Sequence, residues 1–408
     1  MTQFLTLRSV DQILEIIKSF SPLPAERVPL DLALGRVLAE TFLAPAALPG
    51  FSRSTVDGFA VRARDVFGAG EGLPAALTLI GEIPMGLAPS LTIEAGQTVR
   101  VWTGGVLPAG ADAVVMLEYA RSDLTEVVEL VKPLAPGENV ILADEDAFIG
   151  QELIPKGQVI RPQEIALLAA FGQTNVVVRA QPKVAVIATG DEVRSWEAEL
   201  ALGQIRDANS LAVMALATAA GGTAKFYGLI QDDLAALSAL TQKAAAESEV
   251  VVVSGGTSAG QKDFTLKALA SVALAEILVH GAAISPGKPF ILAKSGPKAL
   301  LGLPGHPAGA LVTAEIFLKA LIHGLLGVVA PTWGGGIKAR LSRPCPSAKG
   351  RRDYFRVKLE NREGDLWARP ILGKSGLITP LVGADALAIC PDESEGLALG
   401  ELAEIRLL

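Results

Sequence analysis

The feature that most constrains the fold of this chain is a repeated pattern in its middle third, where apolar runs end in glycine-rich turns. Residues 183–189 (KVAVIAT) lead into residues 190–192 (GDE), and residues 249–254 (EVVVVS) lead into a turn at residues 255–260. Short apolar runs that are rich in β-branched residues and bounded by glycines are typical of buried strands. The middle of the chain is therefore expected to contain a sheet that is buried on both faces.

Helical patterns lie between and after these runs. The sequence predicts a helix over residues 209–220, capped by Asn209 and ended by two glycines, and another helix from about Lys262. A further apolar run, residues 299–303, leads into an amphipathic helix. Because strands and helices alternate, residues 181–328 are predicted to form an α/β domain with a parallel sheet that helices cover on both faces.

Both flanks of this domain are expected to be rich in strands. Residues 47–140 contain short apolar runs separated by Pro and Gly, which predicts a β-rich N-terminal lobe. Residues 329–408 predict a small C-terminal β-barrel, with a hairpin that turns at residues 361–365. Segments 1–46 and 141–180 are expected to supply an N-terminal helix and a connecting arm. The predicted fold class is thus multidomain α/β plus β.

Charge and hydrophobicity limit the location and the partners. Hydrophobic residues make up 50% of the chain, so a membrane span has to be excluded by inspection. The longest apolar stretch, residues 311–330, is interrupted by Glu315, Lys319 and His323, which fall on one stripe of a helix and predict an amphipathic segment. The N-terminal segment lacks a signal-peptide cleavage site, so we expect a cytoplasmic protein without a membrane partner. The net charge of −7 argues against a nucleic-acid partner.

Cysteine and histidine are too scarce for several kinds of site. Cys345 and Cys390 are expected to be two reduced thiols in the barrel. Three histidines cannot build a zinc site of several imidazoles. A serine triad would have to use His306, and no nucleophile-elbow serine lies near it in the sequence.

Three glycine-bearing turns are expected beyond the carboxyl ends of the strands, where parallel sheets bind ligands. The turn at residues 255–260 is a candidate phosphate cradle, because its N–H groups and the following helix N-terminus favour an anion. A tight turn with no ligand is the alternative. The loop at residues 285–289 adds Lys288 as a cation, and residues 304–307 leave amides free at a helix start. His306 in that last turn is either catalytic or an ordinary surface residue.

Acidic residues are predicted at the same edge. Asp191, Glu192 and Asp263 follow strands or turns there, and a Mg²⁺ ion that bridges phosphates would need such carboxylates. The alternative is that each carboxylate caps a helix. In the N-terminal lobe, the polar strings at residues 51–60 and 103–112 are unusual for plain strand connections, but they indicate no particular chemistry by themselves.

Taken together, these strings resemble one family, the MoeA/gephyrin E-domain family of molybdopterin molybdenumtransferases. The resemblance covers essentially the whole chain. Its motifs, in the order of the family, are SRSTVDGFAVRA, TGGVLPAGADAVVM, PGENV followed by Glu145 and Asp146, VAVIATGDEV, GQIRDANS, SGGTSAGQKDF, SPGKPF and GLPGHPAGA.

The resemblance implies an elongated homodimer whose α/β domain is similar to molybdopterin adenylyltransferase. It places the active site in a cleft between that domain and the barrel of one subunit, completed by the β-rich lobe of the other. The implied reaction converts adenylylated molybdopterin and molybdate to molybdenum cofactor and AMP with Mg²⁺ as cofactor. The implied protein partners are the molybdopterin adenylyltransferase and molybdoenzyme acceptors.

The resemblance also assigns roles to individual residues. The implied catalytic residues are Asp263, Asp57, Asp146 and Lys288, with Asp57, Thr103 and Asp146 supplied by the partner subunit. The implied pterin and nucleotide site comprises Thr103, Gly190, Asp191, Ser254, Gly255, Gly256, Ser258, Gly260, Pro304 and Gly305. The implied oxyanion site comprises Lys288, Pro289, Arg351 or Arg352, and Ser375, and the implied metal ligands are Glu192 and Asp263.

The chain departs from the family pattern at several positions. Relatives often carry Asp where this chain has Ser52, and Arg within the segment that is Ile141, Leu142 and Ala143 here. Ser285 replaces a frequent Lys, His306 replaces Asn, and Gly309 replaces a Ser that commonly helps to bind molybdate. These changes thin the positive charge around the anions.

Several interpretations of these departures stay open. They fit a preference for tungstate, a divergent paralogue, or compensation by His306 and Arg206. Besides the transferase, two other classes remain: a molybdopterin-binding scaffold without turnover, and an adenylylating enzyme that shares only the α/β domain.

Overall fold

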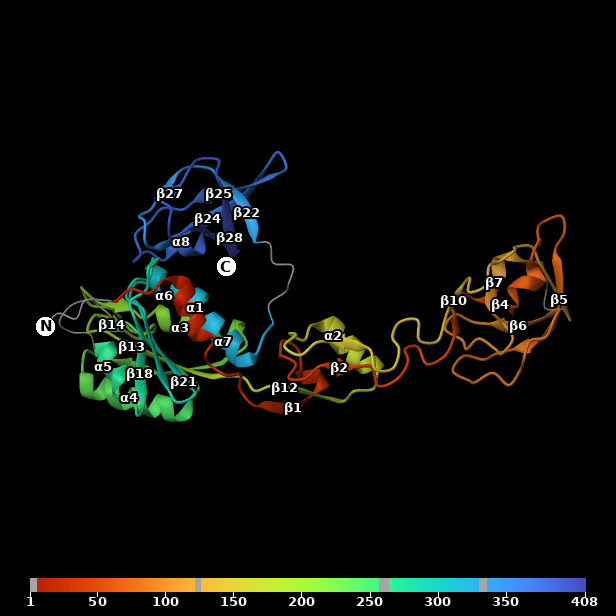
Figure 1. Ribbon diagram of the computed structural model, residues 1–408, viewed down its shortest axis with the longest axis horizontal. Coiled ribbons are helices and arrows are strands. Elements are labelled where there is room, and N and C mark those ends of the chain that lie inside the picture. Colours follow the sequence, from red (N-terminus) through yellow and green to blue (C-terminus); the bar gives the residue numbers. More distant parts are fainter. Residues whose placement is uncertain (1–5, 122–125, 257–263, 330–335) are drawn as a thin grey trace. The chain divides into compact units, whose positions relative to one another are not determined.

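Residues 6–121, 126–256, 264–329 and 336–408 are described by the structure, a computed structural model (Figure 1). The chain forms two compact units. Unit 1 comprises Met1–Glu40, Lys156–Pro162 and Asn175–Leu408, and unit 2 comprises Thr41–Pro155 and Gln163–Thr174. The limits of the four predicted segments remain a prediction.

The core of unit 1 is a six-stranded sheet in the order β16-β13-β17-β21-β20-β18. Its strands are β13 (Lys183–Thr189), β16 (Thr223–Ile230), β17 (Val250–Ser254), β18 (Ala275–His280), β20 (Ile291–Ser295) and β21 (Lys298–Leu303). The first four strands in this order run parallel, whereas β20 runs antiparallel to both of its neighbours. The predicted parallel sheet is confirmed for these four strands, but β20 departs from it, because the two residues between Ser295 and Lys298 are too few for the crossover that parallel strands require.

Both faces of this sheet are buried, as predicted. Along β13, Val184 and Val186 pack into one core cluster, while Ala185 and Ile187 pack into the other. Helices cover each face. The helical segments are α1 (Val10–Ile17), α3 (Asn209–Ala219), α6 (Pro307–Thr313), η4 (Ala314–Leu318) and α7 (Lys319–Leu326) on one face, and α4 (Leu234–Glu247) and α5 (Phe264–Ala270) on the other.

Helix α1 forms where the sequence favours it. Ser9 caps its first turn, and Gln12 returns the bond to the Ser9 backbone, so two otherwise unpaired N–H groups are satisfied. Val10, Ile13 and Ile17 then lie on one buried stripe. The predicted N-terminal amphipathic helix is confirmed, and it belongs to the core of unit 1.

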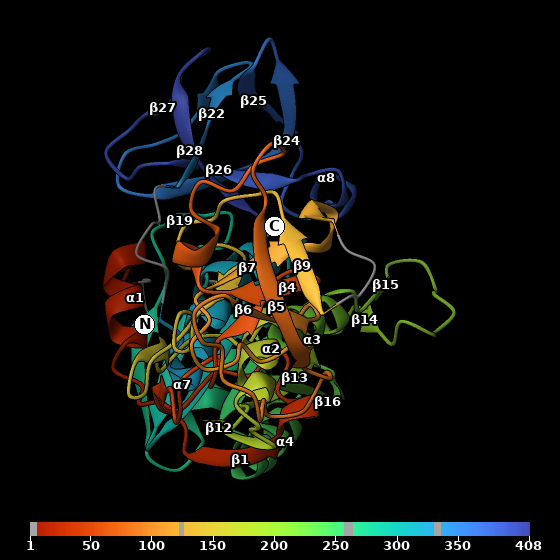
Figure 2. The same cartoon turned by 90° about the vertical axis from the view of Figure 1, so that its right-hand side faces the viewer.

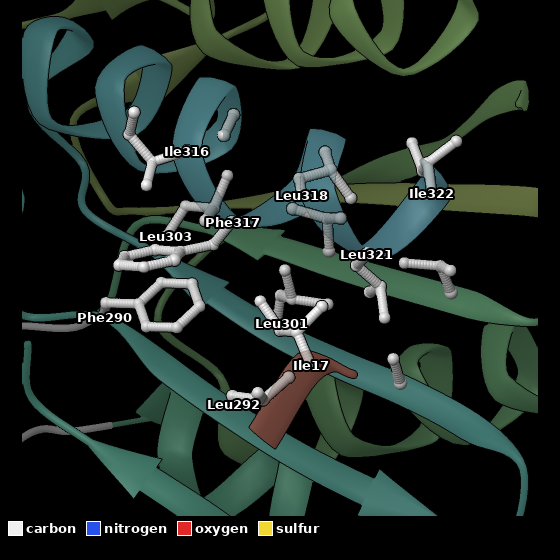
Figure 3. Packing of buried hydrophobic residues seen from close by; sticks show 14 of the residues in the cluster. Ile17, Phe290, Leu292, Leu301, Leu303, Ile316, Phe317, Leu318, Leu321 and Ile322 are labelled. Atoms are coloured by element: carbon white, nitrogen blue, oxygen red, sulfur yellow. The ribbon is translucent and has the colours of Figure 1, made fainter. Parts of the chain in front are cut away.

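Aromatic packing anchors the continuous helical run Pro307–Leu326, formed by α6, η4 and α7, to the sheet (Figure 3). The rings of Phe290, just before β20, and Phe317, in η4, lie 4.6 Å apart between centroids and are both fully buried. Burying one such side chain stabilises the fold by roughly 1.5–3 kcal/mol. This contact fixes the loop that precedes β20 against the helix.

The helical run Pro307–Leu326 is long and apolar enough to cross a membrane, but 72% of its most apolar 18-residue stretch is buried inside the protein, as in a core helix. Glu315 and Lys319 lie on one stripe, as predicted, and their charged atoms are 2.8 Å apart. Glu315 itself is only 6% exposed to solvent. Its carboxylate also pairs with Arg406, whose Nε lies 3.1 Å away. Burial, followed by the nearby Lys319 and Arg406, lowers the pKa of His323.

The C-terminal part of unit 1 is a closed barrel, whose strands are drawn in blue in Figure 2. Its strands are β22 (Ile337–Leu341), β24 (Arg352–Arg362), β25 (Asp365–Pro370), β26 (Ala386–Cys390) and β28 (Leu402–Leu407), and the β24–β26 pairing closes it. The predicted hairpin is confirmed, with Arg362 opposite Asp365. Cys345 and Cys390 are free and buried, and burial raises the pKa of Cys345 to about 11.

Smaller elements complete unit 1. They are β1 (Ala25–Pro29), β12 (Asn175–Arg179), η1 (Leu30–Leu32), β14 (Val193–Arg194), β15 (Ile205–Arg206), β19 (Ile284–Ser285), β23 (Cys345–Pro346), β27 (Gly396–Leu397) and α8 (Thr379–Val382). The pairing of β1 with β12 joins two segments that are far apart in sequence.

Unit 2 is built around a six-stranded sheet in the order β7-β4-β6-β5-β9-β8. Its strands are β4 (Gly58–Val61), β5 (Ala75–Glu82), β6 (Gln97–Val101), β7 (Ala113–Met116), β8 (Ala120–Arg121) and β9 (Val127–Leu130). Outside this sheet lie β2 (Phe42–Leu43), β3 (Arg53–Ser54), β10 (Val140–Ile141), β11 (Glu152–Ile154), η2 (Ala63–Val66), η3 (Leu117–Tyr119) and α2 (Pro162–Ala170). The predicted β-rich lobe is confirmed.

Candidate functional site

Four loops of unit 1 meet at one edge of the core sheet. The turns after β13, β17 and β21 lie together because these three strands are parallel neighbours. The loop at residues 285–289 reaches the same edge because β20 is antiparallel, so that Ile291 at its start pairs with Gly302 near the end of β21. The predicted convergence of the glycine-bearing turns with Lys288 is therefore present.

The turn after β17 requires glycine for packing. Gly255 has φ +100°, and a Cβ atom there would lie 2.2 Å from the Thr189 carbonyl oxygen. Its own N–H donates to the Leu303 carbonyl at 3.2 Å, and its carbonyl accepts from Thr265 Oγ1 at 2.6 Å. Gly256 follows it with φ +61°. The other predicted members of this turn, Ser258, Gly260 and Asp263, lie outside the described residues.

Asn209 joins three elements at this edge. Its side-chain amide donates to Ser254 Oγ at 3.1 Å and to the Gly305 carbonyl at 2.8 Å. The prediction that Asn209 caps its helix is wrong. Asp207 does so instead, accepting from the Ser210 N–H at 3.0 Å, which leaves the Asn209 amide free to link β17 to the turn that follows β21.

Buried polar atoms accumulate beside these turns. Thr189 Oγ1, Asp207 Oδ2 and Ser210 Oγ are buried and have no hydrogen-bond partner within the described part of the chain. Buried polar groups are nearly always satisfied in folded proteins, so a polar ligand or water is expected to meet them. Sequence reasoning missed these residues, although the Asp-x-x-Ser spacing of Asp207 and Ser210 is a capping signal that could have drawn attention to them.

Of the predicted acidic residues, Asp191 and Glu192 are exposed, and Asp263 lies outside the described residues. Asp191 Oδ1 accepts from the Asp232 N–H at 3.0 Å, and Glu192 lies next to Gly190. Among the described residues, no three His, Cys, Asp or Glu side chains gather closely enough to hold a metal ion. The metal site at Glu192 and Asp263 stays a prediction.

Lys288 is exposed, and none of the described residues pairs with its ammonium group. Its carbonyl oxygen accepts from the N–H groups of Ala282 and Phe290, both at 2.9 Å, which fixes the backbone of the loop. Pro289 follows, half-buried, before the buried Phe290. The loop is thus held rigidly while its charge remains available to an anion.

The barrel meets this loop through β19 and β24. Ser285 pairs with Asp353, and the Arg352 N–H donates to the Ala283 carbonyl at 2.9 Å. The guanidinium of Arg352 is occupied by two carboxylates: it bonds both oxygens of Asp11, at 2.9 and 2.8 Å, and Asp392 at 2.9 Å. Of the two arginines predicted for the oxyanion site, Arg351 is therefore the one with more free N–H groups.

A second contact joins the barrel to the turn after β21. Ser375 Oγ lies 3.1 Å from His306 Nδ1, and the Ser375 carbonyl accepts from the Ala308 N–H at 3.0 Å. The predicted barrel serine and the histidine that departs from the family pattern therefore touch each other. Ser375 is thus brought to the same edge as Lys288.

Gly309 stands where relatives commonly carry serine. A Cβ atom there would lie 3.1 Å from Pro304 Cβ, so a side chain would require Pro304 to move by a few tenths of an ångström. The local packing is adjusted to glycine, and a hydroxyl at this position would come only with that movement.

Unit 2 holds a second group of predicted residues. Asp57 Oδ1 accepts from both the N–H and the Oγ1 of Thr103, at 2.7 Å each, and these bonds, the backbone one first, lower the pKa of Asp57. Asp146 is exposed in the loop after β10, where its N–H donates to the Leu48 carbonyl at 3.0 Å. The prediction that these residues act across a subunit boundary remains untested.

Two departures in unit 2 contact each other. Ser52 Oγ accepts from the Ala143 N–H at 3.1 Å. Where relatives often carry an acid and an arginine, this chain has a hydroxyl bonded to a backbone amide. The two positions at which the chain departs from the family pattern are therefore in direct contact.

Three protein-family models match the chain. They are described as "MoeA N-terminal region (domain I and II)" over residues 8–172, "Probable molybdopterin binding domain" over residues 185–323, and "MoeA C-terminal region (domain IV)" over residues 338–408. Together they span both units.

Named relatives match over nearly the full length. The molybdopterin molybdenumtransferase of Nostoc is 35% identical over 371 residues, 90% of this chain and 85% of that protein. The one from Bacillus subtilis is 34% identical over 387 residues, 94% and 90% of the two chains. A crystal structure of a molybdopterin biosynthesis MoeA protein from Pyrococcus horikoshii has a TM-score of 0.85 and 30% identity, with 99% of this chain and 100% of that chain covered.

Proposed function

The chain belongs to the MoeA family of molybdopterin molybdenumtransferases, and from this premise we propose that it inserts molybdenum into adenylylated molybdopterin, yielding molybdenum cofactor and AMP. Its role is in molybdenum cofactor biosynthesis, and its reaction class is that of a transferase.

The observation that carries this proposal is the meeting of neutral turns and exposed cationic side chains at one edge of the core sheet. The turns after β13, β17 and β21 offer backbone N–H groups and hydroxyls, which suit the pyrophosphate of an adenylylated substrate. Lys288 and Arg351 offer positive charge within adjoining segments, which suits an oxyanion such as molybdate. The proposed substrates need both kinds of group.

The backbone N–H groups and hydroxyls of these turns would bind and orient the pterin nucleotide. Asn209 holds Ser254 and the Gly305 carbonyl in fixed positions, so the two turns that contact the nucleotide keep one spacing. Such positioning raises the rate of transfer because the reacting groups are held together before reaction. Lys288 would hold molybdate next to them as a point charge.

Mg²⁺ fits the donor set of this edge. The side chains available there are carboxylates and hydroxyls, which are the hard oxygen ligands that Mg²⁺ prefers, and one or two carboxylates suffice where substrate phosphates supply the rest. Asp191, Glu192 and the unpaired oxygen of Asp207 offer these donors. When bound, the ion would neutralise charge on the phosphates.

We further propose that the protein works as a cytoplasmic homodimer. The Asp57–Thr103 pair and Asp146 belong to unit 2, and the resemblance assigns them to the active site of the partner subunit. The molybdopterin adenylyltransferase would supply the substrate, and molybdoenzymes would accept the product.

The test is a reaction of the purified protein with adenylylated molybdopterin, Mg²⁺ and molybdate. Repeated turnover with release of AMP supports the transferase. Tight binding of the pterin without AMP release would instead indicate a scaffold, and AMP formation from ATP and metal-free molybdopterin would indicate an adenylylating enzyme. We expect Asp263→Asn to abolish cofactor formation without dissociating the dimer.

Competition between molybdate and tungstate in the same assay tests the oxyanion. Gly309 stands in place of the serine that the resemblance associates with molybdate binding, while His306 of the core domain is hydrogen-bonded to Ser375 of the barrel. We propose molybdate as the substrate, and stronger saturation by tungstate would reassign it.

A further inference from the structure

Arg351 and Arg352 are neighbours in sequence but have different acidic partners. Arg352 is bound by Asp11 and Asp392 and is 20% exposed. Arg351 pairs with Asp353, and the guanidinium side chain is 45% exposed while the carboxylate side chain is 4% exposed. A buried acid therefore holds an arginine that reaches solvent.

The contacts between the two side chains are close. Arg351 Nε lies 2.9 Å from Asp353 Oδ1, and Nη2 donates to Oδ2 at 3.2 Å. Ser347 Oγ also donates to Oδ2, at 2.9 Å. Within the described chain, Oδ1 has no aligned hydrogen-bond donor, so the nearby Nε balances its charge by attraction alone. The carboxylate thus depends on Arg351, and its burial fixes the place of the guanidinium.

The pair lies beside the segment that carries Lys288. Asp353 is paired with Ser285 through β19 and β24, and the neighbouring Ala282 N–H donates to the Lys288 carbonyl. The barrel acid and the core lysine are therefore attached to the two sides of one short backbone segment.

We propose that Asp353 is a positioning residue for the transfer reaction, which orients Arg351 so that its remaining N–H groups bind the same molybdate as Lys288. This inference rests on the proposed function. Two of the guanidinium nitrogens face Asp353, and Nη1 remains for an anion. An exposed arginine without such a partner loses rotamer freedom when it binds an anion, and a fixed partner removes that cost beforehand.

A purely electrostatic role for Asp353 predicts the opposite change in anion binding, so the two roles can be distinguished by experiment. If Asp353 merely offsets positive charge, its removal would strengthen the binding of an anion, because one negative charge leaves the neighbourhood. If it positions Arg351, its removal weakens binding. The two roles predict opposite signs for the same substitution.

The experiment measures AMP release against molybdate concentration, with saturating adenylylated molybdopterin and Mg²⁺, for the wild type and Asp353→Asn. We expect the KM for molybdate to rise roughly threefold to tenfold, with kcat within about twofold of wild type. A KM that falls, or one that stays unchanged in a folded variant, overturns the proposal. Thermal unfolding shows whether the variant is folded.

A double-variant cycle tests whether Asp353 acts through Arg351. Arg351→Lys keeps the charge but loses the planar fork of donors. We expect the double variant of Arg351→Lys with Asp353→Asn to have the KM of Arg351→Lys alone, because the positioned group is already lost. Independent, additive increases in KM would overturn the proposal.

Matched variants provide the controls. Asp365→Asn removes an exposed carboxylate of the same barrel, 3.3 Å from Arg340, and we expect it to leave the KM unchanged. If Asp353→Asn does not fold, Ser347→Ala removes the hydroxyl bond to the same carboxylate, and we expect a smaller rise in KM; no rise overturns the proposal. Absence of AMP release by the wild type would overturn the proposed function itself. An active wild type whose KM for molybdate is unchanged by Asp353→Asn would overturn only the role of Asp353.

Discussion

The loop at residues 285–289 and the start of β24 lie side by side, yet they use positive charge in opposite ways. Lys288 is exposed, and its ammonium has no partner among the described residues. Arg352 makes three hydrogen bonds to Asp11 and Asp392. A cation already held by two acids stabilises the fold, whereas an unpaired cation on a rigid loop is available to a ligand.

The number of cations near a site therefore does not show how strongly the site can bind an anion. Around the pairing of β19 with β24, Arg352 is paired with two acids, Arg351 is paired with Asp353, and Lys288 has no partner within the part of the chain that the structure describes. Under the proposed function, the cations that the resemblance finds missing from this chain leave more of the oxyanion binding to Lys288 and to whatever orients Arg351. Substitution of each cation in turn distinguishes charge that serves function from charge that serves stability.

The largest effect is expected for Lys288→Ala. Cofactor formation should fall by roughly 100-fold or more, because a group that stabilises charge in the transition state is lost. The free energy of unfolding should change by less than about 0.5 kcal/mol, since the side chain is exposed. The measurements are AMP release and urea unfolding, with Lys338→Ala as the control for loss of a surface cation. Turnover close to wild type would show that the unpaired charge does not mark the site.

Arg352→Ala is expected to behave in the opposite way. It leaves Asp392, 20% exposed, without its bond to Arg352, so the free energy of unfolding should fall by about 1–3 kcal/mol. The rate for the folded fraction should remain within several-fold of wild type. Urea unfolding measures the free energy of unfolding, and AMP release measures the rate. Arg340→Ala, which removes an exposed pair, should cost less than about 1 kcal/mol. A large loss of rate with normal stability would reverse the roles assigned to these cations.

His306→Ala tests the second contact between core and barrel. It removes the 3.1 Å bond to Ser375 Oγ but leaves the backbone bond from Ala308 to Ser375. One hydrogen bond is worth about 1 kcal/mol, so the KM for molybdate should rise roughly fivefold. His306→Gln, which retains a polar group, should recover part of the effect. An unchanged KM would assign this contact to packing alone.

The smallest effect is expected for Asp11→Asn, and it depends on pH. The hydrogen bond from Arg352 lowers the pKa of Asp11, so its stabilising contribution is present above the ordinary aspartate pKa and is lost as the pH falls through the lowered value. Asp11 is 68% exposed, so solvent screening keeps the effect below about 1 kcal/mol. Unfolding at about pH 6 should distinguish variant from wild type, and the difference should shrink as the pH falls below the ordinary aspartate pKa. A difference that grows on acidification would contradict this account.

Much of the fold could be predicted because its signals are local. The runs that became β13 and β17, the capped N-terminal helix and the hairpin of β24 and β25 are each specified by neighbouring residues. The convergence of the turns at one edge followed from strand polarity. Strand β20 was not predicted, and neither was its antiparallel direction, which follows from the short connection between Ser295 and Lys298.

The site was predicted less completely. Turns and cations were identified, but Asn209 was taken for a helix cap, and the buried atoms of Asp207 and Ser210 were overlooked. Arg351 and Arg352 could not be told apart. Their difference depends on Asp11, which is 341 residues from Arg352 along the chain and meets it only after α1 has packed on the core.

The sequence by itself determined which segments become strands, helices and glycine turns, because hydrophobic periodicity and backbone freedom act over a few residues. The tertiary structure alone decided which charges stay free, which are paired and which hydroxyls face one another across the contact of core and barrel. Coulomb attraction and hydrogen bonding depend on distances in space, and the distance between Asp11 and Arg352, or between His306 and Ser375, is set only by the folded chain.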